Sequence, residues 1–132
     1  MQMTNFEELR PAPGSELMLK VSATNADTNI HGDIYAGWLL NQMDAAATLF
    51  ATKLSKGRCS TVAVADIQFQ SPINVGDLVS LYARLEDSGR SSMVVVVEVF
   101  GESNSSDATA KVTEGRFTSV AIDAQGSIRQ IL

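Results

Sequence analysis

One long proline-free segment constrains the fold of this 132-residue chain more than any other feature. Residues 34–57 read IYAGWLLNQMDAAATLFATKLSKG, and their pattern predicts a single long helix. Asp33 suits the N-cap, because its carboxylate can accept an otherwise unpaired backbone N–H. Lys53 and Gly57 suit the C-terminal end, where positive charge and a helix stop are favoured. The rest of the fold has to pack around this helix.

The predicted helix is apolar around much of its circumference. At 100° per residue it has two apolar strips, one of Leu39, Met43, Ala46, Phe50 and Leu54 and a second of Trp38, Ala45 and Leu49. We therefore expect the helix to be largely enclosed.

The remaining segments are extended in pattern and short in their connections. Runs rich in Val, Ile, Phe, Tyr and Thr predict strands at residues 16–24, 59–69, 78–85, 91–100 and 108–123. One strand, one helix and four strands joined mostly by short turns favour an antiparallel sheet curling around the helix, an α+β fold. We expect a flexible N-terminal segment at 1–14, a single domain at 15–125 and a C-terminal tail at 126–132.

Composition excludes several classes of function. Ten Lys and Arg against 15 Asp and Glu give a net charge of −5, which argues against nucleic acid as a partner. One histidine and one cysteine, Cys59, leave no set of ligands for a zinc site, so no metal is expected. With no signal-peptide pattern and no membrane-spanning run, we expect a cytoplasmic protein without a membrane partner.

Asp44 is the most informative single residue, because it places a carboxylate in the middle of the most apolar segment. It shares a stripe of roughly 80° with small and polar residues, namely Gly37, Asn41, Thr48 and Thr52. This stripe is either the solvent face of the helix or a site or subunit contact. A solvent face would usually carry several Lys or Glu, and this one has a single charge over four turns.

The loop before the helix is the second candidate. It reads Asn29-Ile30-His31-Gly32-Asp33 and leads to a helix N-terminus, whose free N–H groups can stabilise a developing oxyanion. His31 fits an exposed loop position as well as a catalytic one. Asn29 fits a turn cap as well as a site.

Four blocks of the sequence resemble bacterial acyl-CoA thioester hydrolases of the hotdog-fold superfamily, the YciA-like branch. They are NADTNIHGDIYAGWLLNQMD, TVAVADIQF, SPINVGDLV and KVTEGRFTSVAID, and the likeness extends over residues 16–125. The resemblance implies a hotdog fold, in which an antiparallel sheet wraps around one long helix. It also implies hydrolysis of acyl-CoA to a free acid and coenzyme A between two subunits, without a cofactor, since coenzyme A belongs to the substrate.

The resemblance also assigns roles to residues. Asp44 matches the catalytic acidic residue, which acts as general base or nucleophile, Asn29 matches the loop asparagine, and the N–H of Gly37 polarises the thioester carbonyl. Thr61 matches a threonine near the site of the neighbouring subunit. Further substrate-binding candidates are His31, Ala36, Trp38, Arg84 and Arg90. The chain departs from the family at Ala36, often glycine there, and at Ala63 and Ser71, often arginine there.

Two other functions remain open at this point. One is a non-catalytic module that binds or senses acyl-CoA, and the other is a hydroxyacyl-thioester dehydratase using His31 and Asp44.

A single sheet around one helix leaves a strand edge open, so we expect a homo-oligomer, at least a dimer and up to a tetramer or a trimer of dimers. Pocket shape should depend on how Tyr35, Trp38, Met43 and Phe69 pack, and the pathway expected is fatty acid metabolism.

Overall fold

The computed structural model describes residues 10–131, so most of the predicted flexible segment at 1–14 lies outside the described residues. The elements in chain order are β1 (Glu16–Ser22), a short 3-10 helix (Asn25–Asp27), α1 (Ala36–Ser55), β2 (Cys59–Phe69), β3 (Leu78–Ser88), β4 (Ser92–Glu102) and β5 (Thr109–Ala121). The predicted order of one strand, one helix and four strands is confirmed, and the strand bounds differ by up to three residues.

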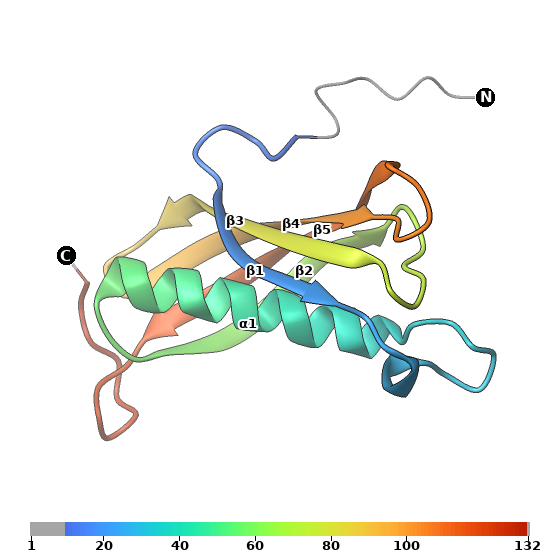
Figure 1. Ribbon diagram of the computed structural model, residues 1–132. Coiled ribbons are helices and arrows are strands. Elements are labelled where there is room, and N and C mark those ends of the chain that lie inside the picture. The colour runs from blue at the N-terminus through green and yellow to red at the C-terminus, as the bar shows by residue number, and fades with distance from the viewer. Residues whose placement is uncertain (1–9, 132) are drawn as a thin grey trace.

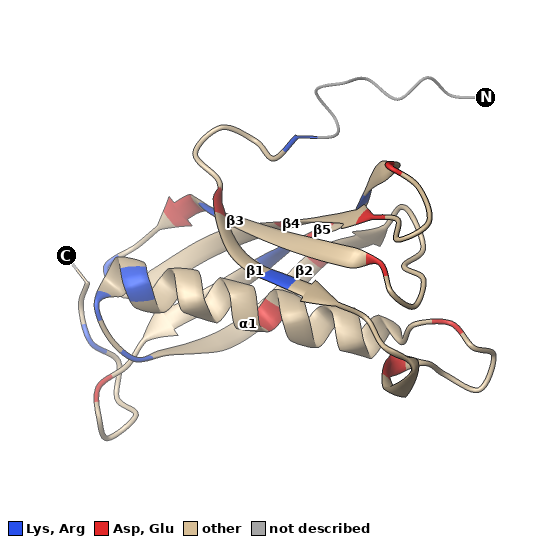
Figure 2. Cartoon of the chain, in the orientation of Figure 1, with Lys and Arg blue, Asp and Glu red and all other residues tan. Residues whose placement is uncertain are grey.

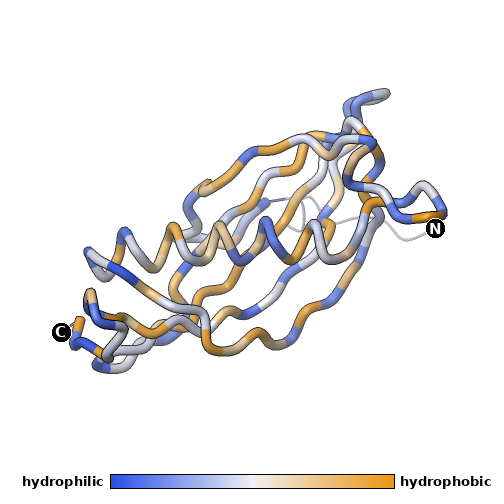
Figure 3. The backbone as a smooth tube through the Cα atoms, turned by 90° about the horizontal axis from the view of Figure 1, so that it is seen from below, coloured by the Kyte–Doolittle hydropathy of each residue, from blue (hydrophilic) through white to orange (hydrophobic). Residues whose placement is uncertain are grey.

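The five strands form one sheet in the order β1-β3-β4-β5-β2, and every neighbouring pair is antiparallel. The helix α1 lies along one face and contacts all five strands, as Figure 1 shows. In Figure 3, viewed from the helix side, the strands run on both sides of α1. The predicted architecture of a sheet curled around one helix is confirmed.

One face of α1 carries the core. Its fully or nearly buried residues are Leu39, Met43, Ala46, Ala47, Phe50 and Ala51. Opposite them, β3, β4 and β5 contribute buried residues such as Leu81, Val95, Val97 and Phe117. The apolar side chains that alternate along β4 therefore pack against those that recur every 3.6 residues along α1, in one apolar layer.

The prediction that α1 is largely enclosed is wrong for a single chain. Leu49 and Leu54 are 47% and 45% exposed, and Ala45 is also exposed. The physical reason is that one sheet covers only one side of a helix. The edge strand β2 is open as well, with Val62 60% exposed.

The predicted N-cap is also wrong. The helix begins at Ala36 after Tyr35, which caps it without a side-chain hydrogen bond. Asp33 is held elsewhere, because its N–H donates to the side chain of Asn29 and its carbonyl accepts from the N–H of Asn29. At the other end Lys56, not Gly57, takes the left-handed conformation with φ of 58°.

The outer face of the sheet carries a charged network around the buried Glu98 of β4. Its Oε1 accepts from Arg84 at 2.7 Å and from the N–H of Ala12 at 2.9 Å, and its Oε2 lies 3.2 Å from Lys111. Burial opposes the charge of Lys111, but its bonds to Glu114 and Glu98 prevail and raise its pKa. The network fastens the start of the described chain to the sheet.

The last described residues fold back onto the end of α1. The guanidinium of Arg129 donates to the carbonyl oxygens of Ser55, Arg58 and Ile122 and to the hydroxyl of Ser55, at 2.9–3.2 Å. The boundary expected at residue 125 stays a prediction, but Arg129 ties the tail to the domain. Within residues 10–131, no helix is long and apolar enough to cross a membrane.

Candidate active site

The site is centred on Asp44, the one acidic residue of α1. Figure 2 shows that most of the length of α1 is uncharged. Its side chain is half-buried, on the side of α1 that faces β2. Thr61 of β2 donates its hydroxyl proton to Oδ1 of Asp44 at 2.6 Å. Oδ2 has no partner among the residues that the structure describes. One carboxylate oxygen is thus fixed and the other is available to a ligand.

Thr61 therefore contacts the candidate acid of its own chain, where the resemblance had implied a neighbouring subunit's site. The register explains how it reaches Asp44. Between Thr61 and Ala63 the pairing of β2 with β5 shifts by one residue, and a second shift follows between Ala65 and Gln68, where Asp66 has a φ of 57°. These bulges bend the edge strand and re-aim its side chains.

The loop before α1 is tied together by Asn29. Its Oδ1 accepts from the N–H groups of His31 at 2.8 Å and Asp33 at 3.1 Å, and the bridge between Thr28 and Ile34 closes the loop. Asn29 is half-buried and His31 is exposed. The side-chain oxygen of Asn29 is thus occupied in shaping the loop, which leaves its amide N–H groups for a ligand.

The start of α1 presents free backbone donors. Within the described chain, no acceptor bonds the N–H groups of Ala36 and Gly37, and both residues are exposed. A Cβ added at Gly37 would meet nothing within 4 Å, so the space around this residue is open. Such N–H groups, at the positive end of the helix dipole, suit an anionic oxygen.

Asp44 and these donors are far apart in one chain. Gly37 precedes Asp44 by seven residues, which at 1.5 Å per residue is about 10 Å along the helix axis. Helix N–H groups also point toward the N-terminus, so those of Ala36 and Gly37 point away from Asp44. An oxygen bound to them therefore lies even farther from the carboxylate of the same chain.

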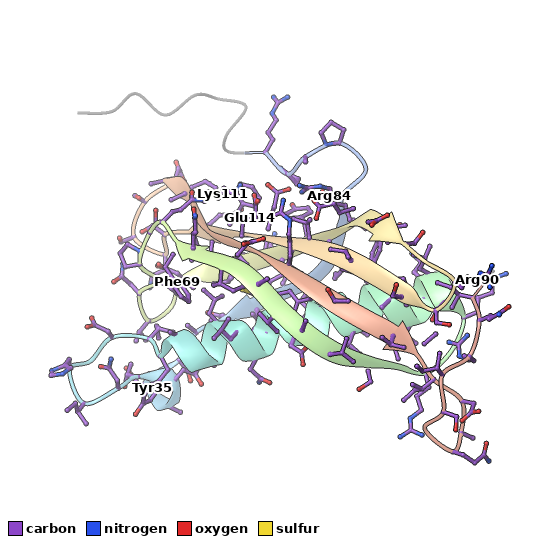
Figure 4. The ribbon with its side chains drawn as sticks, turned by 180° about the vertical axis from the view of Figure 1, so that it is seen from behind. Tyr35, Phe69, Arg84, Arg90, Lys111 and Glu114 are labelled. Carbon is purple, nitrogen blue, oxygen red and sulfur yellow. The ribbon has the colours of Figure 1, made fainter. Side chains whose placement is uncertain are left out.

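Among the other predicted binding residues, only Trp38 joins Ala36 on the first turn of α1, where it is half-buried against the core. Arg84 lies on the outer face of the sheet, paired with Glu98 at 2.7 Å. Arg90 lies in the turn between β3 and β4, at the end of the molecule opposite Tyr35 in Figure 4. One chain does not bring either arginine to Asp44.

A cavity of about 290 Å³ opens beside the helix start. It lies between the start of α1 and the segment that follows β2, and its lining residues are Ile34, Tyr35, Ala36, Leu39, Phe69, Gln70, Ser71, Pro72, Ile73 and Val112. Of the residues expected to shape a pocket, Tyr35 and Phe69 line it, whereas Met43 is fully buried in the core.

The sequence did not indicate most of this cavity. The loop after β2 pairs with β5, because the N–H groups of Gln70 and Ser71 donate to the carbonyl of Val112. Gln70 and Ser71, which follow Ala36 by about 35 positions in sequence, thereby lie near the helix start. No local sequence pattern reveals this. Within residues 10–131, no three His, Cys, Asp or Glu side chains gather closely enough to hold a metal ion.

The comparisons with known proteins agree with this geometry. Residues 31–108 match the model of the thioesterase superfamily. The acyl-CoA thioester hydrolase YciA of Escherichia coli is 38% identical over 122 residues, which cover 90% of this chain and 92% of that protein.

Solved structures of thioesterases are also similar to this chain. The crystal structure of a hexameric broad specificity acyl-coenzyme A thioesterase is 39% identical, with a TM-score of 0.86, and the match covers 93% of this chain and 84% of that one. The hexameric hotdog fold thioesterase of Campylobacter jejuni is 32% identical, with a TM-score of 0.84 over 89% of this chain and 90% of that one. The chain therefore has the hotdog fold and belongs to the thioesterase superfamily.

Proposed function

We propose that this protein is an acyl-CoA thioesterase that hydrolyses acyl-CoA to a carboxylic acid and coenzyme A, with Asp44 as its catalytic carboxylate. The observation that carries the proposal is the hydrogen bond from Thr61 to Asp44. A half-buried carboxylate held by one oxygen in the middle of a mostly apolar helix has little structural use. Its free oxygen suits proton abstraction from water or direct attack on a carbonyl carbon.

The N–H groups of Ala36 and Gly37 form the proposed oxyanion site. They would donate hydrogen bonds to the thioester carbonyl oxygen as it becomes negatively charged in the transition state. Because they lie about 10 Å from Asp44 and point away from it, one chain cannot supply both parts to a single carbonyl group. We therefore infer that Asp44 of one copy works with the helix start of a second copy.

The reaction then follows one of two alternative routes, which give the same end products. In the first, Asp44 takes a proton from water, the water oxygen bonds to the thioester carbon, and the carbon–sulfur bond breaks. In the second, Asp44 bonds to the carbon itself, and water hydrolyses the resulting anhydride. In both, the sulfur leaves as a thiolate that takes up a proton, and Thr61 orients the carboxylate throughout.

The open surfaces support an assembly of copies. Leu49 and Leu54 on α1 and Val62 and Val64 on β2 are 45–60% exposed, although a strand edge and an apolar helix strip are costly to leave in water. A second copy placed against these residues would cover both the strand edge and the helix strip, and the hexameric state of the two solved relatives supports a hexamer here as well.

A reducing cytoplasmic setting suits the single Cys59, and acyl-CoA as substrate places the protein in fatty acid metabolism.

The remaining candidates take secondary roles in this proposal. Asn29 shapes the loop beside the oxyanion site and offers its amide N–H groups there, while His31, Ala36 and Trp38 border the path of the substrate. Arg84 and Arg90 lie away from Asp44 in one chain. They can bind the phosphates of coenzyme A only where a neighbouring copy brings a site to them.

Release of free coenzyme A from acyl-CoA thioesters tests the proposal. We expect turnover by the unchanged protein and a loss of about 10²–10⁴-fold in Asp44→Asn, which keeps the shape but removes the base. Asp66→Asn is the matched control, since Asp66 is an exposed aspartate of β2 and asparagine tolerates its left-handed backbone. Binding of acyl-CoA without any release would instead identify a sensing module.

A further inference from the structure

We propose that the 290 Å³ cavity beside the start of α1 is the site of the acyl group and that it selects uncharged chains of up to about ten carbons. This inference rests on the proposed thioesterase function and adds its substrate class. The cavity is separate from Asp44 and Thr61, neither of which lines it.

The position of the cavity links it to the reacting carbonyl group. Ala36 lines the cavity and also carries one of the two free N–H groups of the proposed oxyanion site. A carbonyl oxygen bound there places the carbonyl carbon within a few ångströms of the cavity. Of the two groups on that carbon, the acyl chain is the apolar one, so it is the one that gains by leaving water.

The lining defines the chemistry of the guest. Its residues include no Asp, Glu, Lys, Arg or His, and Leu39, Ile73 and Val112 form a floor that is 2–8% exposed. Gln70, Ser71 and Tyr35 are the lining residues with polar side chains. An ionised group in such a cavity would lose its water without gaining a partner of opposite charge. A chain ending in a carboxylate is therefore excluded.

The size of the cavity sets a limit on chain length. At about 290 Å³ it lies at the lower end of the ~300–1,000 Å³ range of small-molecule sites. With ~30 Å³ for each group the size of a water molecule, this volume, which is open to solvent in a single chain, has room for about ten carbons. Up to that length, each methylene taken from water should raise kcat/KM about fourfold, and longer chains should gain nothing more.

Two aromatic residues stand at the mouth. Tyr35 at the start of α1 and Phe69 at the end of β2 are 51% and 52% exposed, and Figure 4 shows both at the same end of the molecule. Because each is half in water, substitution there changes the opening at little cost to the fold. Ser71, which is half-buried in the lining, offers a position from which a larger side chain fills the cavity.

The first experiment compares thioesters of matched length in steady-state release of coenzyme A. Hexanoyl-CoA and adipoyl-CoA both have six acyl carbons and differ by a terminal carboxylate. We expect kcat/KM to favour hexanoyl-CoA by at least 100-fold. We also expect a rise from acetyl-CoA to about decanoyl-CoA that stops at longer chains. Equal use of hexanoyl-CoA and adipoyl-CoA, or a rise that continues to hexadecanoyl-CoA, would overturn the inference.

Variants locate the selectivity in this cavity. Ser71→Phe should shorten the preferred chain by several carbons, and Phe69→Ala should reduce the gain per methylene. Ile128→Ala, which also truncates a strongly exposed apolar side chain but lies outside the cavity, should leave the chain-length profile unchanged. If both cavity variants keep the profile of the unchanged protein, the acyl group lies elsewhere.

A binding measurement separates this inference from the proposed function. Calorimetric titration of the Asp44→Asn variant with hexanoyl-CoA and adipoyl-CoA reports the preference without turnover. A preference for hexanoyl-CoA that Ser71→Phe abolishes supports the acyl site even if the unchanged protein releases no coenzyme A. Turnover of acyl-CoA without such a preference supports the thioesterase function and rejects the acyl site.

Discussion

Thr61 donates a hydrogen bond of 2.6 Å to Asp44 across the gap between β2 and α1, and this bond fixes the orientation of the proposed catalytic carboxylate. Without it, the side chain of Asp44 gains rotational freedom and Oδ1 loses its donor. The partner of the proposed catalytic residue is thus a strand residue 17 positions later in the chain.

Replacing Thr61 by valine should lower kcat about tenfold, because a hydrogen bond to a charged group contributes about 1.5 kcal/mol or more. Thr61→Ser keeps the hydroxyl and should retain most of the activity. The comparison of kcat with KM in the two variants checks this, since a positioning role lowers kcat and leaves KM nearly unchanged. Equal activity of the valine and serine variants would contradict it.

Arg129 should contribute about 2 kcal/mol to the free energy of unfolding, because its four hydrogen bonds close the C-terminal end of α1. Arg129→Met keeps an unbranched apolar stem and removes these bonds. Thermal unfolding should show a Tm lower by several degrees. The exposed Gln130→Met is the control, and a loss of similar size there would show that the guanidinium is not responsible.

Glu98 should be the most sensitive charged residue of the outer face. Glu98→Gln leaves Arg84 and Lys111 without their buried partner, and breaking a buried pair of this kind costs about 3 kcal/mol. The exposed Glu102→Gln on the same strand should change the free energy of unfolding by less than about 0.5 kcal/mol. Urea unfolding of both variants gives the comparison, and similar midpoints would refute the central role of Glu98.

The pair of Glu86 and Arg116 makes stability depend on pH in the acid range. The guanidinium of Arg116 hydrogen-bonds the exposed Glu86 at 2.7 and 2.9 Å and holds its pKa below the ordinary value. The pair therefore stabilises the fold above the ordinary glutamate pKa of about 4.3 and loses this effect as the pH falls below it. The difference in unfolding free energy between the unchanged protein and Glu86→Gln should shrink from pH 7 to pH 3. A difference that grows on acidification would contradict the assignment.

The sequence predicts most of the fold because its strongest signals are local. The period of α1, the strand-rich runs and the short turns each depend on neighbours within a few residues. Asp33 is the instructive error. Its residue type is right for an N-cap, but Asn29 and the bridge from Thr28 to Ile34 hold the loop extended past it.

The site is predictable only in part, for a physical reason. Asp44 is conspicuous by pattern alone, since a carboxylate interrupts an apolar helix. Its contact with Thr61 depends on the bulges of β2, and the cavity depends on the pairing of Ser71 with Val112. These relations join residues far apart in sequence, and hydrophobic periodicity carries no information about them.

The exposure of Leu49 and Val62 also could not be predicted from the sequence. A pattern of apolar residues indicates that a surface is to be buried, but not whether the same chain or a second copy buries it. The sequence therefore predicted enclosure of α1, and the single chain leaves that strip open.

The central claim is that Asp44 of one copy acts with the helix start of another, and mixing two inactive variants tests it most directly. Asp44→Ala removes the carboxylate. Gly37→Pro removes one N–H donor in the first helical turn, where proline is tolerated. Each protein alone should release coenzyme A at a rate lower by orders of magnitude, while circular dichroism shows both folded.

Refolding the two variants together in equal amounts gives the decisive result. If sites form between copies, half of the pairs are mixed and each mixed pair has one intact site, so the rate of coenzyme A release should recover to about a quarter of that of the unchanged protein. Every chain of the mixture lacks one of the two parts. If one chain formed the whole site, the mixture would stay as inactive as its components, and that result would contradict the account.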